Sequence, residues 1–319
     1  MDKQSLFALL KKLRGPFFLS ILFTLIWFVV LFPTSDLGDL VSTKVSEFTQ
    51  NQVFLQFDEF SFDVAPPGVE FSNVFLESPF FPGFSAETIS IAPSVSGMIS
   101  QKPYGTVKAQ GFLDGTISAT VKKGQATDAG VERHRLLLDV EKISLASVRE
   151  MLKWTTAFEG RISLTADGQG DLALNEQPDV DLKLEVDKFA LPPATINTMM
   201  GPLTLPDMKL GIIHLKGRLS NGKFLIESGE IGKKQDDLFG KIKGSWNVQL
   251  MMMGGRPVPQ LGAYDFEVDL VANKQFQAKA GLFLSLLDQY KTMTGDGARY
   301  QFKVSGADLY NPPSINATR

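Results

Sequence analysis

The strict alternation of apolar and polar residues is the feature that most constrains this chain. Between residues 179 and 187, the apolar residues Val180, Leu182, Leu184 and Val186 share one parity, and charged residues occupy the other. Successive side chains of a strand point to opposite faces of a sheet, so this pattern predicts a strand with one apolar face and one wet face. The chain is therefore expected to form a sheet that must cover one of its sides.

The same period of two recurs at hairpin spacing. Ile213 and Leu215 lie in an alternating run, Asn221-Gly222 follows, and the alternation resumes at Phe224. Two alternating runs separated by Asn-Gly are the strongest short-range signal for a β-hairpin. Asp114-Gly115 marks a second hairpin in the same way.

Together these runs predict a mainly β fold of about a dozen strands, a long antiparallel meander in which neighbours in sequence pair. Glycines within the strands are the points where such a sheet bends; they are Gly111, Gly217, Gly240 and Gly244. The few predicted helices lie near residues 37–48, 145–152 and 282–290. Residues 190–206 are rich in proline, contain a predicted helical turn at 196–200, and mark a point of subdivision, and residues 251–259 are predicted to be a flexible break.

An uncharged apolar run precedes the β-rich part. It extends from Phe17 to Phe32 and includes Leu22 and Trp27. At about 1.5 Å per residue, a helix over residues 15–33 is roughly 28 Å long, close to the hydrocarbon thickness of a bilayer. The run therefore predicts a transmembrane helix that anchors the chain.

The charges on either side of the run set its orientation. Basic residues precede it and acidic residues follow it; they are Lys3, Lys11, Lys12 and Arg14, then Asp36 and Asp39. The positive-inside rule places residues 1–14 in the cytoplasm and residues 34–319, the β-rich domain, on the opposite side of the membrane. The alternative is a cleaved signal peptide, which would make the chain an exported surface protein, but the run is longer than a signal core and no small-residue cleavage site follows.

Composition narrows the functional classes. Charged residues are 21% of the chain and the net charge is -3, so no basic field favours nucleic acid as a partner. Cysteine is absent, which excludes disulfides and thiolate metal sites and fits an oxidising compartment such as the bacterial periplasm. The two histidines, His134 and His214, have no metal-binding spacing, and no phosphate loop or nucleophile elbow is present. We expect no enzyme, no catalytic or metal-binding residues and no cofactor.

Three stretches resemble a known family. They are the run Val-Ala-Pro-Pro-Gly-Val-Glu at 64–70, the segment from Ile143-Ser144-Leu145 to the Glu-Gly-Arg-Ile-Ser-Leu run at 159–164, and Leu215 to Phe224 followed by Gly240 to Gly244. In this order, behind an anchor, the chain resembles the N component of the type II secretion system in its delta-proteobacterial form, which is in turn similar to the AsmA-like proteins. The resemblance spans nearly the whole chain. It implies an inner-membrane anchor, a periplasmic β-rich body, partners among the secretion components, and a curved sheet with a groove that suits lipid.

Two functions follow from these observations. The first is a non-enzymatic structural or interaction element of a type II secretion apparatus, anchored in the inner membrane. The second is a periplasmic module that binds or transfers phospholipid, and an enzyme is a distant third. The groove of the second hypothesis would be lined by Val180, Leu182, Leu184, Ile213, Leu215, Phe266 and Val268. The sequence leaves the oligomeric state open.

Overall fold

A single large sheet dominates the molecule. The computed structural model describes residues 19–20, 23–24, 27, 34–49, 51–64, 67–79, 81–126, 132–154, 156–171, 173–198, 201–253, 256–295 and 297–318. Within these ranges the chain forms one antiparallel sheet of 16 strands, a separate two-stranded hairpin and a few short helices. The predicted mainly β fold is confirmed.

Strands make up most of the elements, and a few short helices separate groups of them. The strands are β1 (Phe54–Gln56), β2 (Glu59–Val64), β3 (Pro67–Ser78), β4 (Phe81–Pro93), β5 (Gly105–Phe112), β6 (Gly115–Lys123), β7 (His134–Ser144), β8 (Glu159–Gly170), β9 (Asp179–Leu191), β10 (Ala194–Thr198), β11 (Gly201–Leu205), β12 (Met208–Ser220), β13 (Lys223–Ile231), β14 (Leu238–Met253), β15 (Arg256–Asn273), β16 (Lys291–Thr294), β17 (Gly297–Gly306) and β18 (Ser314–Ala317). The helices are α2 (Thr34–Phe48), α3 (Val95–Ser100), α4 (Leu145–Leu152), α5 (Lys274–Lys279), α6 (Gly281–Ser285) and the 3-10 turn η1 (Asp288–Tyr290).

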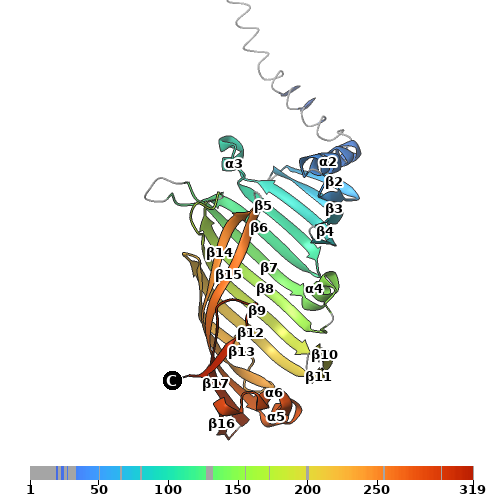
Figure 1. Ribbon diagram of the computed structural model, residues 1–319. Coiled ribbons are helices and arrows are strands. Elements are labelled where there is room, and N and C mark those ends of the chain that lie inside the picture. The colour runs from blue at the N-terminus through green and yellow to red at the C-terminus, as the bar shows by residue number, and fades with distance from the viewer. Residues whose placement is uncertain are drawn as a thin grey trace, which may run out of the picture.

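The sheet is a meander, as predicted. Its order is β1-β3-β4-β5-β6-β7-β8-β9-β12-β13-β14-β15-β17-β16, with β2 on β3 and β18 on β17. The hairpin β10–β11 stands apart, yet β9 pairs directly with β12 beside it, so the sheet is continuous across residues 190–206. In Figure 1 the strands from β3 to β12 descend through the molecule, while β14 and β15 run along its left side. The strand direction therefore changes between the β3–β12 part of the sheet and β14–β15.

Bulges keep the apolar residues on one face. Val140 and Ile143 in β7 are three residues apart, which would place them on opposite faces of a regular strand. The register of β7 against β8 shifts between them, and Lys142 takes a left-handed φ of 54°. The extra residue of this bulge restores the parity. The register shifts in other strand pairs, such as β12–β13 and β13–β14, likewise leave apolar residues opposite apolar residues or glycines.

Two of the predicted bending glycines have different roles. Gly111 has a φ of 69° and lies at a register shift between β5 and β6, so it forms a bulge that a larger residue would strain. At Gly217, a Cβ atom would lie 2.4 Å from the ring of Phe224 on β13. This glycine is needed because an aromatic ring packs over it, and the register also shifts beside it.

Buried apolar clusters lie at the two ends of the sheet. The N-terminal core comprises Phe60, Phe71 and Val74, and Val41 of α2 packs against it. The C-terminal core joins β15 and β17 to α5; its buried members are Ala272, Phe276, Ala280, Ala298, Tyr300 and Phe302. Helices therefore cap both ends of the sheet, with α2 at the upper end of Figure 1 and α5 and α6 at the lower end.

Two local predictions were wrong. In the predicted break at 251–259, the described residues 251–253 and 256–259 are paired ends of β14 and β15, and Met251 lies opposite Val258. In the predicted helical turn at 196–200, the described residues 196–198 belong to strand β10, and Ile196 lies opposite Leu203 of β11. In both places cross-strand pairing overrides a weak local preference.

The predicted anchor falls mostly on residues that the structure does not describe. Phe17, Leu22 and Phe32 lie outside the described residues, and Trp27 is helical and exposed. No helix in the described part of the chain has the length and apolar character needed to cross a membrane. The helix predicted at 37–48 is confirmed as α2.

Candidate functional site

All seven residues predicted to line a groove lie on one face of the sheet. Leu184 on β9 faces Leu215 on β12, and Val186 faces Ile213. The other members are Val180 and Leu182 on β9 and Phe266 and Val268 on β15, and all seven side chains are half-buried. We call this side of the sheet the apolar face and the opposite side the polar face.

The apolar face is continuous across the strands. One row of directly opposed residues reads, from β3 to β17, Val69, Ile91, Val107, Ala119, Leu138, Ala166, Leu182, Gly217, Ile226, Gly244, Phe266 and Val304. The adjacent row reads Phe71, Ile89, Ala109, Ile117, Val140, Leu164, Leu184, Leu215, Gly229, Ile242, Val268 and Phe302. Neither row contains a polar or charged side chain. At about 4.8 Å per strand, each row is roughly 50 Å long.

The face between the two ends is only partly covered. The buried clusters found among the described residues lie at the ends of the sheet. Between them Val107 on β5 and Leu136 on β7 are exposed and Leu184 on β9 is half-buried, although Val186 on β9 and Ile226 on β13 are buried. Soluble proteins seldom leave an apolar surface of this extent open, and when they do it marks a binding surface. The central rows are therefore the candidate site.

The polar face has a different character. Its side chains pair across the strands, as in Arg218 with Asp181 and His214 with Glu185 at 2.7 Å. Arg135 with Asp167 and Arg299 with Asp269 form further ion pairs of this kind. The hydrogen bond from Arg218 lowers the pKa of Asp181 below its ordinary value. Such a ladder of exposed pairs keeps this face wet and ionised.

Open depressions occur between these polar side chains. One of about 310 Å³ is lined by residues that include Lys183, Glu185 and His214, and one of about 470 Å³ spans β7 to β13. Lys216 contributes to both, and it also forms an ion pair with Glu227. Charged side chains contribute to the linings of both depressions, and the first lining also includes Leu184 and Leu215. The apolar rows contain no charged side chain, so we place the site on the apolar face.

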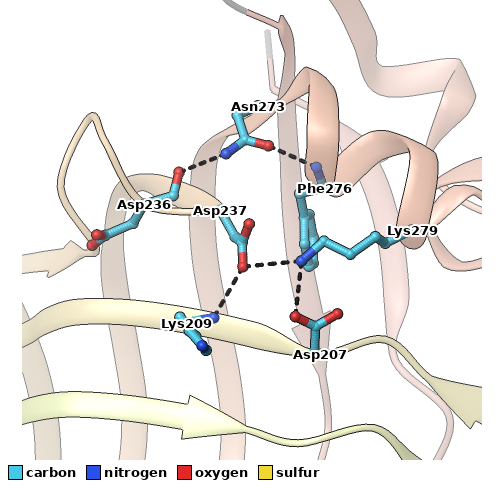
Figure 2. A network of polar contacts seen from close by, with 7 residues as sticks. All are labelled: Asp207, Lys209, Asp236, Asp237, Asn273, Phe276 and Lys279. Atoms are coloured by element: carbon cyan, nitrogen blue, oxygen red, sulfur yellow. Dashed lines mark hydrogen bonds and ion pairs between the residues drawn. The ribbon is translucent and has the colours of Figure 1, made fainter.

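A network of polar contacts closes the C-terminal end of the apolar face (Figure 2). Lys279 of α5 donates to Asp207, just before β12, at 3.0 Å, and to Asp237 in the β13–β14 connection at 3.5 Å. Asp237 also accepts from the backbone N–H of Lys209 at 3.1 Å. Asn273 caps α5 by accepting from the N–H of Phe276 at 2.6 Å. We call this set the latch, because it ties the helical cap to a strand three places away in the sheet.

The latch makes Lys279 a strongly held cation. The hydrogen bond to Asp207 is the main cause of a raised pKa at Lys279, and burial opposes it. The pair with Asp207 is partly accessible, and the contact with the more buried Asp237 is long at 3.5 Å, so each contact taken alone contributes little to stability. Their combined effect is geometric, since they fix where α5 sits over the end of the apolar rows.

No metal chemistry is assembled in the described part of the chain, where no three of the metal-ligating side chains gather. Of the two histidines, His214 pairs with Glu185 on the polar face. The ring of His134 lies against that of Tyr104, with centroids 5.8 Å apart and the ring planes tilted by 52°.

Several features of the site were missed from the sequence. Helix α3 was not predicted, although Ser94 before it is a good N-cap and Val95, Met98 and Ile99 have helical spacing. The latch was also missed, because Asp207, Asp237 and Lys279 are far apart in sequence and no local pattern joins them.

Comparison with known proteins adds no relative: no family model, no curated protein and no solved structure matches the chain. The functional argument therefore depends on the site itself.

Proposed function

We propose that this chain is a membrane-anchored periplasmic protein that binds lipid acyl chains along the apolar face of its sheet. The observation that carries the proposal is the uninterrupted pair of apolar rows, roughly 50 Å long, which end in packed cores and whose side chains between these ends are mostly half-buried or exposed. A curved sheet would turn these rows into the lining of a groove.

Acyl chains suit this surface better than a protein partner does. The rows offer no polar or charged side chain that could register a peptide, and acyl chains require none. A bilayer core of about 30 Å holds two layers of acyl tails, so one tail is roughly 15 Å long. The rows could accommodate several tails, which suits a carrier or conduit more than a site for one small ligand.

The anchor is the second part of the proposal. Residues 15–33 would span the inner membrane with the N-terminus in the cytoplasm, and α2 would connect this span to the sheet. Because α2 begins at Thr34, the connection leaves little slack, and the upper end of the sheet in Figure 1 would lie near the bilayer.

Lipid extraction from the purified full chain tests the proposal. The chain is purified in mild detergent, and bound phospholipid is quantified by mass spectrometry. Leu184→Asp places a carboxylate in the middle of the apolar face, and we expect it to reduce bound phospholipid several-fold, because burying an ion among acyl chains is costly.

Thr165→Asp is the matched control. Thr165 on β8 lies on the polar face, directly opposite Lys183 of β9. Thr165→Asp therefore adds the same carboxylate one strand away from position 184, on the other side of the sheet. Its bound phospholipid should equal that of the unchanged chain. A folded unchanged chain without phospholipid, or an equal loss in both variants, would contradict the proposal.

A role in type II secretion is a further proposal, which rests on the family resemblance alone. It requires that deletion of the gene impair export of secreted proteins. If Leu184→Asp complements the deletion fully, the secretion role does not depend on lipid binding, and unchanged secretion after deletion would remove that role.

A further inference from the structure

Helix α3 turns its apolar side toward solvent. Val95, Met98 and Ile99 are 62%, 59% and 81% exposed. Residues at positions i, i+3 and i+4 lie on the same side of a helix, so the three side chains form one outward cluster, which we call the α3 tip. A helix on a protein surface normally turns such a stripe inward. The reversed orientation calls for an explanation.

The orientation of α3 is fixed by tight local contacts. The Ser94 hydroxyl accepts from the N–H of Gly97 at 3.0 Å, and the N–H of Lys102 donates to the carbonyl of Gly97 at the other end. Gly97 itself is buried, and a Cβ atom there would lie 2.7 Å from the carbonyl oxygen of Tyr104. The side of α3 that faces the protein therefore has room only for a glycine, and the apolar side chains must point away.

Tyr104 is in turn held from the other side. Its hydroxyl donates to Glu132 at 3.2 Å, and Glu132 also pairs with Lys102 at 2.8 Å. These contacts tie the base of α3 to the segment that leads into β7. The α3 tip is thus a rigid projection.

The α3 tip carries no charge that would resist removal from water. Residues 88–101 contain no acidic or basic side chain, and the nearest cation, Lys102, is neutralised by Glu132. Inserting the tip into an apolar phase would bury apolar side chains and serine hydroxyls, but no ion. A lipid surface accepts such a segment at a depth of about 5–10 Å, at the boundary between headgroups and acyl chains.

The position of α3 identifies the surface. Figure 1 shows α3 and α2 at the same end of the molecule, and α2 begins one residue after the apolar run that we propose spans the membrane. From this juxtaposition we propose that the α3 tip inserts into the bilayer that holds the anchor, and so makes a second membrane contact for the sheet. This inference rests on the anchor in the proposed function, and it deepens that function by fixing the orientation of the sheet on the membrane.

The lack of cysteine in the chain allows a direct test. Ile99→Cys in the full chain is labelled with an environment-sensitive nitrobenzoxadiazole fluorophore and reconstituted into vesicles of phosphatidylethanolamine and phosphatidylglycerol. Doxyl-labelled phospholipid then serves as a quencher inside the bilayer. Leu282→Cys on α6 is the matched control, because Leu282 is also exposed, at 69%, and α6 lies at the end of the molecule opposite α3 in Figure 1.

The proposal predicts blue-shifted emission and about threefold stronger lipid-borne quenching at position 99 than at position 282, because only position 99 would reach the acyl boundary. Equal quenching at the two positions, in chains that float with the vesicles, would overturn the α3 contact and leave the anchor intact. A blue shift at position 99 without lipid-borne quenching would place the tip against a second copy and also overturn it. Failure of the chain to float would overturn the anchor and this inference together.

Discussion

Truncating a side chain in the middle of the apolar face should cost much less than truncating one at its capped end. Phe276 is 6% exposed and belongs to the same buried cluster as Tyr300 and Phe302. Phe276→Ala should therefore reduce the free energy of unfolding by about 3–5 kcal/mol, since both transfer free energy and a cavity term are lost. Leu184 is only half-buried. Leu184→Ala opens no enclosed cavity and should cost about 1 kcal/mol, roughly half the transfer free energy of the deleted carbons.

The free energies of unfolding are compared by urea titration of the lipid-free full chain in detergent, with tryptophan fluorescence as the probe. Leu225→Ala is the control, because Leu225 is exposed on the polar face opposite Arg218, and it should change the free energy by less than about 0.5 kcal/mol. A cost of about 3 kcal/mol or more for Leu184→Ala would mean that the central rows are already a packed core. There would then be no open surface for lipid, and the reasoning behind the proposed function would fail.

Three further predictions concern the supports of this face. Lys279→Met removes the two ion pairs of the latch and should cost about 1 kcal/mol or less in urea unfolding, since the pair with Asp207 is accessible and the contact with Asp237 is long, but it should accelerate amide exchange in α5. The pKa of Asp181 is lowered from 3.8 by its hydrogen bond from Arg218, so this pair contributes stability above pH 3.8 that is lost as the pH falls through the folded-state value. The urea midpoint should drop there, and less steeply in Asp181→Asn. Gly217→Ala should cost about 1–3 kcal/mol in urea unfolding, because its Cβ would lie 2.4 Å from the ring of Phe224.

Each of these predictions has an outcome that would contradict it. Unchanged exchange in α5 of Lys279→Met would show that the apolar contacts of the cap hold it without the latch. An acid transition of the same slope in Asp181→Asn would assign the loss of stability to other carboxylates. Gly281 has no atom near its would-be Cβ, so Gly281→Ala is the control for Gly217→Ala, and equal effects would remove the argument from ring packing.

The sequence predicted the meander because its information is local. Alternation gave the faces of β9 and β12, and Asn221-Gly222 fixed the turn that joins β12 to β13. The seven predicted lining residues share a face because the period of two carries through each strand, and the bulges correct the places where spacing is odd, as at Lys142.

What the sequence could not predict depends on distant partners. Met251 to Met253 lead into a stretch rich in glycine and proline, which strands disfavour, yet they form a strand because β15 pairs with them. Lys279 meets Asp207 only once the whole sheet from β12 to β15 has formed. The orientation of α3 depends on the packing of Gly97 against Tyr104. Helical periodicity alone would predict the opposite orientation, with Val95, Met98 and Ile99 turned toward the protein.

Site-specific photo-crosslinking in cells tests the central claim most directly. Benzoylphenylalanine is introduced at Leu184 on the apolar face and, separately, at Thr165 on the polar face, and the irradiated chain is analysed by intact mass. We predict adducts of phospholipid mass at position 184 and none at position 165. The absence of lipid adducts at position 184, or equal adducts at both positions, would contradict the assignment of the apolar face as a lipid-binding surface.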